Sequence, residues 1–199
     1  LGKNHFIVCA TDEAPALMSV SRLEENGCVG DMAMPDEKGI VDPELLAEMI
    51  TPTTAMVSLS WGNGMTGTLQ PVKEIAQVCK SKGALLHVDA THVLGKLLYD
   101  WSTLGVDYLT FNGEQFHAPR GVGGLLVRKG APAYPLIVGG IEQNSLRAGN
   151  LNVASLVALS EACREGEDQI DFTGTEVARL RNKLEASICE KCPQARLFF

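Results

Sequence analysis

Short apolar runs alternate with segments of helical periodicity through the first half of the chain, a pattern typical of strands separated by helices. The alternation predicts an α/β domain built on a mostly parallel central sheet that is flanked by helices. Ligands of such sheets bind beyond the carboxyl ends of the strands, so polar residues there are the first candidates for a site. The predicted strands cover residues 5–10, 28–32, 54–60, 84–89, 106–111 and 122–127.

Capping signals define several of the predicted helices. Asp42-Pro43-Glu44 is a helix start, because a side-chain acceptor precedes proline in the first turn. Gly83 follows the helical segment 72–82 and fits the left-handed position past a helix end. Residues 62–67 form a glycine-rich loop. Further helices are predicted over residues 12–25, 155–163 and 176–188, the last two with apolar faces.

Composition and charge narrow the class of protein. The chain is 45% hydrophobic and 21% charged, as in ordinary globular domains. A formal net charge of −7 without any lysine or arginine cluster argues against nucleic acids and anionic membranes as partners. No apolar run approaches the roughly 20 residues that span a bilayer, and the first residues do not form a secretory signal. We therefore expect a cytoplasmic protein.

The six cysteines are scattered through apolar elements, which indicates reduced thiols and not a disulfide framework. Cys189 and Cys192 have the spacing of a redox or zinc pair. They lack a second pair and a nearby histidine, so a helix end that carries two thiols is the simpler interpretation. No other spacing of histidine, cysteine and aspartate predicts a metal site.

Both ends of the sequence look interrupted. A strand is predicted within a few residues of Leu1, and the apolar ending Leu197-Phe198-Phe199 is typical of a strand cut short. We expect residues 1–199 to be the central part of a large domain, with an N-terminal segment and a C-terminal small domain missing.

Asp89 lies at the carboxyl end of predicted strand 84–89, where an acid serves either as a cap or as a ligand-binding group. The segment around it, His-Val-Asp-Ala-Thr-His-Val-Leu-Gly-Lys at 87–96, resembles the core motif of class V aminotransferases, and of cysteine desulfurases in particular. The resemblance covers nearly the whole chain and implies the large-domain fold of transferases that depend on pyridoxal 5′-phosphate (PLP). Matching segments include Asn63, Gly67 and Gln70, then 105–107, 118–121 and 139–150.

The resemblance assigns cofactor-binding roles to five residues. Asp89 matches the aspartate that pairs with the pyridine nitrogen of PLP and keeps it protonated. His92 stands where the family has a glutamine that contacts the ring hydroxyl, and Asn63 matches the first asparagine of the family's loop. Asn112 and Asn150 replace a serine and a threonine that bind phosphate, the latter in the neighbouring subunit. Each replacement keeps a hydrogen-bond donor.

Other positions depart from the family pattern. Gln115 stands at the position of the Schiff-base lysine, and an amide can neither form that bond nor shuttle protons as a base. Glu13 stands at the position of the histidine that stacks on the ring, and Gly64 replaces the loop's second asparagine. Glu114 replaces a phosphate-binding histidine, and a carboxylate ~4 Å from a phosphate charge costs about 4 kcal/mol at an effective dielectric near 20. Lys96 is interpreted as a surface lysine.

These matches and departures leave three hypotheses. The first is a cysteine desulfurase-like protein that is catalytically impaired or inactive, in which Gln115 is the decisive change. The second is an active PLP-dependent desulfurase or related transferase that holds PLP without a covalent bond. The third is a protein that binds another small molecule or regulates a dimer partner. The family implies a homodimer at full length and admits an active desulfurase or a sulfur-transfer protein as partner. Its sulfur-accepting cysteine should lie beyond residue 199.

Overall fold

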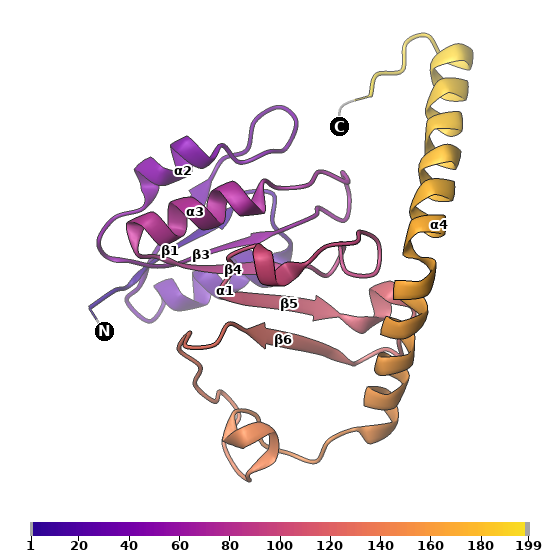
Figure 1. The fold of residues 1–199 in the computed structure, drawn as a ribbon. Coiled ribbons are helices and arrows are strands. Elements are labelled where there is room, and N and C mark those ends of the chain that lie inside the picture. The colour runs from indigo at the N-terminus through magenta and orange to yellow at the C-terminus, as the bar shows by residue number, and fades with distance from the viewer. Residues whose placement is uncertain (1, 198–199) are drawn as a thin grey trace.

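The computed structural model describes residues 2–197 and contains a six-stranded sheet in the order β2-β1-β3-β4-β5-β6 (Figure 1). All neighbouring strands are parallel except β6, which runs antiparallel to β5. The predicted α/β fold with a mostly parallel sheet is therefore confirmed. The strands are β1 (His5–Cys9), β2 (Val29–Ala33), β3 (Thr54–Ser60), β4 (Leu85–Asp89), β5 (Tyr108–Asn112) and β6 (Gly123–Val127).

The helices lie on both faces of the sheet, with α1 on one face and α2 and α3 on the other (Figure 1). Asp42 caps α2 as predicted, since its carboxylate accepts the N–H of Glu44 at 2.8 Å. Gly83 ends α3 in the left-handed conformation, with φ at 72°. The helices are α1 (Ala14–Glu24), α2 (Pro43–Met49), α3 (Val72–Lys82) and α4 (Val153–Lys191), with short 3₁₀ turns η1 (Trp101–Thr103), η2 (Gly113–Phe116) and η3 (Glu142–Ser145).

The main core lies between the sheet and the α2–α3 layer. Alternate strand residues such as Ile7, Val57 and Leu86 pack there with Leu46 of α2 and Ile75 of α3, and all five are buried. Side chains alternate between the two faces of a strand, so the intervening residues point to the α1 face. That second face is more polar, which matters for the site described below.

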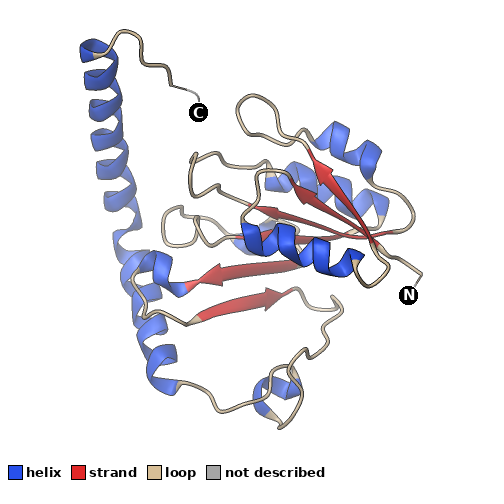
Figure 2. Cartoon of the chain, turned by 180° about the vertical axis from the view of Figure 1, so that it is seen from behind, coloured by secondary structure: helices blue, strands red, loops and turns tan. Residues whose placement is uncertain are grey.

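The two helices predicted over 155–163 and 176–188 form one continuous helix, α4, of 39 residues (Figures 1 and 2). The prediction of a break was wrong because the intervening segment lacks apolar periodicity. A solvent-exposed helix does not need an apolar face, and charged pairs such as Arg164 with Glu161 and Asp168 support it at helical spacing. The predicted apolar faces remain largely exposed to solvent, and Ala162 is the only buried residue of α4.

The first turns of α4 pack beside the carboxyl end of β5. Leu159 and Ala162 contact a small cluster formed by Phe116, Ala118 and Val122 around η2. Cys189 and Cys192 are exposed at the far end of this helix, in line with the interpretation of two thiols at a helix end. None of the helices within residues 2–197 combines the length and the apolarity needed to cross a membrane.

Asp107 joins three strands through its buried carboxylate. One oxygen accepts the backbone N–H of Leu86 at 2.8 Å, and the other accepts Nε of Arg128 at 2.9 Å. The backbone carbonyl of Asp107 also accepts the N–H of Arg128. Asp107 therefore fixes the start of β5 against both neighbouring strands, β4 and β6.

We predict that Asp107→Ala lowers the free energy of unfolding by about 2 kcal/mol, because the buried N–H of Leu86 loses its acceptor. Asp107→Asn is the matched control. It keeps an acceptor for Leu86 and loses only the ion pair with the half-exposed Arg128, so the expected cost is below about 1 kcal/mol. Urea unfolding of the two variants measures the difference, and equal costs would contradict this account.

Candidate functional site

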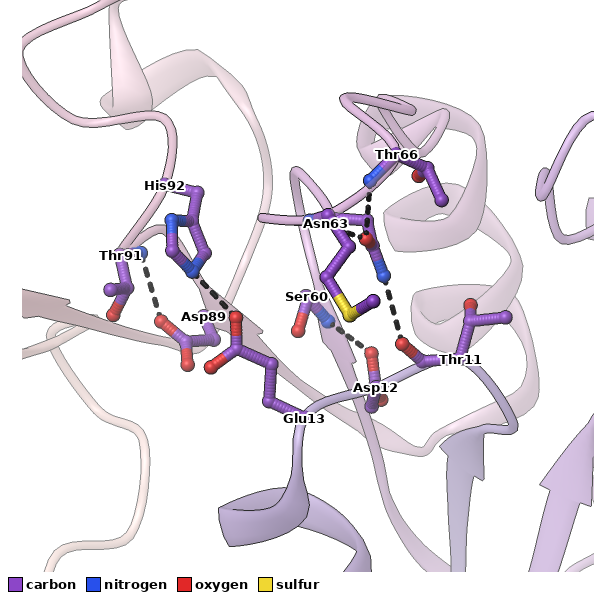
Figure 3. Close-up of polar contacts among 10 residues, drawn as sticks. Thr11, Asp12, Glu13, Ser60, Asn63, Thr66, Asp89, Thr91 and His92 are labelled. Carbon is purple, nitrogen blue, oxygen red and sulfur yellow. Dashed lines mark hydrogen bonds and ion pairs between the residues drawn. The ribbon is translucent and has the colours of Figure 1, made fainter. Parts of the chain in front are cut away.

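The carboxyl ends of β1, β3 and β4 meet at one edge of the sheet, because the three strands are parallel neighbours. Each strand leads into a loop with polar side chains: residues 10–13 after β1, 61–70 after β3 and 90–100 after β4. Three of the predicted site residues, Asn63, Asp89 and His92, lie at this edge (Figure 3). The sheet therefore gathers residues that are far apart in the sequence.

Asp12 fixes the loop after β1. Its buried carboxylate accepts the N–H of Cys9 at 3.0 Å and the N–H of Ser60, at the end of β3, at 2.8 Å. Burial raises the pKa of Asp12 above its usual value, and these two hydrogen bonds oppose the rise. Sequence reasoning missed this role. The available signal was an acid that directly follows a buried strand.

Asn63 fixes the same loop from the other side. Its amide donates to the carbonyl of Thr11 at 2.9 Å, and its carbonyl oxygen accepts the N–H groups of Met65 and Thr66 (Figure 3). The side chain thus holds its own loop and the neighbouring one together. These hydrogen bonds give Asn63 a structural role, and its contact to a cofactor stays a prediction.

Asp89 and His92 follow each other on β4 and its loop. One carboxylate oxygen of Asp89 accepts the N–H of Thr91 at 2.9 Å, and the side chain is half-buried at the strand end. Nε2 of His92 lies 2.5 Å from a carboxylate oxygen of Glu13, in the loop after β1 (Figure 3). The residue expected at the stacking position therefore forms a polar contact with His92.

A hydrogen-bonded row crosses three strands on the α1 face of the sheet. Nδ1 of His87 lies 2.7 Å from Oγ of Ser58, and its Nε2 lies 3.1 Å from Oγ1 of Thr110. The row lines a cavity of about 480 Å³ between α1 and the sheet, which reaches Ser60 and Asp89 at the strand ends. These contacts give His87 a structural role within the sheet. The alternation of polar and apolar residues along the strands was the sequence feature that could have indicated these hydrogen bonds.

Asn112, Glu114 and Gln115 lie at the carboxyl end of β5 and in η2. The side chain of Asn112 accepts the N–H of Glu114 at 3.0 Å and so caps the 3₁₀ turn. Glu114 forms an ion pair with Nε of Arg120 at 2.8 Å. Gln115 is half-buried. The turn thus presents an amide and a paired carboxylate, and no amine.

Two further residues named from the sequence take no part in these contacts. Asn150 is exposed in the segment that precedes α4. Lys96 is exposed in the loop after β4, as interpreted, and partial desolvation lowers its pKa. Among residues 2–197, no group of three or more histidine, cysteine, aspartate or glutamate side chains is arranged to hold a metal ion.

Comparison with known proteins identifies the class to which this fold and site belong. The sequence model of the family described as Aminotransferase class-V matches residues 1–191, and the chain belongs to that family. Within it, the chain is similar to cysteine desulfurases. It is 33% identical over 195 residues to "Cysteine desulfurase" of Nostoc sp. (strain PCC 7120) and 35% identical over 190 residues to "Cysteine desulfurase NifS" of Azotobacter vinelandii. These matches cover 98% and 95% of the chain but only 49% and 47% of the relatives.

Solved structures agree with the fold. A structure titled "NIFS-LIKE PROTEIN" has a TM-score of 0.91 at 31% identity, over 94% of this chain and 52% of its own. DndA from Streptomyces lividans has a TM-score of 0.86 at 31% identity, over 94% of this chain and 54% of its own. The chain spans about half the length of the curated relatives it matches.

Burial lowers the pKa of His87 below its ordinary value of 6.5, which makes stability depend on pH. The unfolded chain binds a proton there near pH 6.5 and the folded chain does not, so the stability from this group is present above pH 6.5 and is lost as the pH falls below it. We predict a loss of up to about 1.4 kcal/mol per pH unit from His87. Urea unfolding between pH 7.5 and 5 should show a smaller slope for His87→Gln. An unchanged slope would contradict a neutral buried ring.

Proposed function

We propose that this chain is part of a cysteine desulfurase-like protein that is catalytically impaired or inactive, because Gln115 takes the place of the lysine that holds PLP in its family. The observation that supports this is the chemistry of η2. The turn directly follows β5 and carries Gln115 half-buried, next to Glu114. A glutamine amide is not a nucleophile and cannot serve as a proton-shuttling base.

Other lysines do not offer a simple replacement. The sequence has no lysine from residue 97 to residue 128. Lys129 follows β6, and since β6 is antiparallel to β5, that end of the strand lies at the opposite edge of the sheet from η2. Lys96 is exposed in the loop after β4, where its neighbour Gly95 lies against Phe116 of η2. A Schiff base on Lys96 would therefore use an amine from a different loop than the family's lysine position.

The phosphate of PLP also finds a poor site around η2. Asn112 still offers its amide N–H groups as donors, since only its oxygen caps the turn, but Glu114 contributes a negative charge. Arg120 is the nearby cation, but it is paired with that carboxylate. A phosphate here would compete with Glu114 for Arg120. The residues present do not fit covalently held PLP, and we derive no catalytic step through it.

One observation favours the second hypothesis, an active enzyme with non-covalent PLP. Asp89 is retained at the end of β4, and only one of its oxygens accepts a hydrogen bond among the contacts of residues 2–197. A half-buried carboxylate with a free oxygen suits a protonated pyridine nitrogen. Asp89 and Glu13 at one edge equally suit a small cationic ligand, which is the third hypothesis.

An inactive protein of this kind can act through partners. The segment 134–141 exposes several large apolar side chains, namely Tyr134 at 79%, Leu136 at 95%, Val138 at 77% and Ile141 at 88%. Exposed apolar surface on this scale suggests an interface. We propose a homodimer of the complete, cytoplasmic protein, with an active desulfurase or a sulfur-transfer protein as a further partner.

We predict that the intact wild-type protein forms no site-specific Schiff base with PLP. The expected result is an absorption spectrum of free PLP and no borohydride-fixed adduct on a unique lysine, since η2 has no amine. Peptide mapping after borohydride treatment measures this. Gln115→Lys is the matched variant, and we expect it to gain an adduct at position 115 at high PLP concentration.

A wild-type adduct mapped to one lysine would contradict the proposal. The variant Lys96→Arg distinguishes an adduct on Lys96 from random labelling of surface lysines. Loss of the adduct in this variant would identify Lys96 as the amine, whereas random labelling of surface lysines would remain unchanged.

A further inference from the structure

The ring of His92 lies against Gly64 so closely that a side chain at position 64 would displace it. A Cβ atom built on Gly64 would be 2.5 Å from Nε2, 2.7 Å from Cε1 and 2.9 Å from Cδ2 of the ring. Gly64 does not have a positive φ, whereas nearby Gly67 has φ at 76° and nothing within 4 Å of its Cβ position. The backbone conformation therefore favours glycine at position 67, and the ring favours glycine at position 64.

The same ring also contacts Glu13, in the loop after β1. Nε2 of His92 lies 2.5 Å from the carboxylate, and the two side chains are 24% and 47% exposed. An exposed ion pair by itself contributes little. Here the loop that carries Glu13 is already fixed by Asp12 and Asn63, and the ring is seated on Gly64. Both partners are thus held in place before they meet.

These three residues are all departures from the family motif, and they meet in a single contact. Glu13 and His92 are 79 residues apart in the sequence and come from different loops. The strand order brings these loops together, so that His92 lies against both Gly64 and Glu13.

We propose that Glu13, Gly64 and His92 form a latch that closes the sheet edge beside Asp89 and excludes planar ring ligands; this deepens the function proposed above and rests on it. The latch joins the loop after β1 to the loop after β4, and Asp89 lies at the end of β4 next to it (Figure 3). A planar ligand ring that approaches Asp89 from this edge of the sheet has to separate His92 from Glu13. The closed state therefore reduces the apparent affinity of any such ligand.

The first test is whether positions 64 and 92 are coupled. Gly64→Ala should lower the Tm of the intact protein by about 4 °C, because the new methyl group displaces the ring. In a His92→Ala background, the same substitution should change Tm by less than about 1 °C. Gly166→Ala is the control for a glycine with open space at its Cβ position. Because Gly166 lies within α4, where alanine is the better helix former, this substitution should leave Tm unchanged or raise it. Equal losses in the two backgrounds would overturn the latch.

The second test is ligand exclusion. Pyridoxine 5′-phosphate is a suitable probe, since it has the ring and phosphate of PLP but no aldehyde. Quenching of the buried Trp61, whose backbone N–H donates to the backbone carbonyl of Asp89, can report binding at the edge. His92→Ala opens the latch because it removes the ring, and it leaves the charge of Glu13 unchanged. We expect it to bind the probe about tenfold more tightly than the wild type.

Equal binding by the wild type and His92→Ala, including no binding by either, would overturn ligand exclusion. This result is independent of the proposed lack of a Schiff base, because the probe cannot form one. A lysine adduct with PLP in the wild type would instead overturn the proposed function, whatever the affinity of the probe.

Discussion

The candidate site depends on one buried carboxylate. Asp12 accepts backbone N–H groups from the ends of both β1 and β3, and so sets the path of the chain from the sheet into α1. Burial raises the pKa of this carboxyl group, and the two N–H donors oppose that rise. Glu13 follows immediately and gains its position from this anchor. The contact with His92 across the strand edge is therefore a consequence of backbone geometry fixed one residue earlier.

Local signals were sufficient to predict most of the fold. The strand at Thr54–Ser60 and the helix at Val72–Lys82 have the boundaries expected from periodicity and from Gly83. α4 was divided in error, because ion pairs in its polar middle stabilise a helix without leaving an apolar pattern. Periodicity indicated the apolar faces of α4, but it does not say whether another element covers them, so their degree of burial could not be predicted.

The candidate site was predictable residue by residue but not as a set of contacts. Strand ends pointed to Asp89, and the family resemblance pointed to His92 and Glu13. Their pairing, and the space that Gly64 leaves for the ring, arise from strand order, which brings together loops that are distant in the sequence. Glu114 is a similar case: the repulsion expected from its charge is offset by Arg120, a partner set by the turn between β5 and β6.

The continuous α4 helix has a mechanical consequence. At 1.5 Å per residue its 39 residues extend for about 58 Å, and only the first turns rest on the cluster beside η2. The contact at Ala162 lies beside η2, and roughly 44 Å of helix separates it from Lys191. A tilt of about 5° at this contact would therefore move the far end of α4 by about 4 Å.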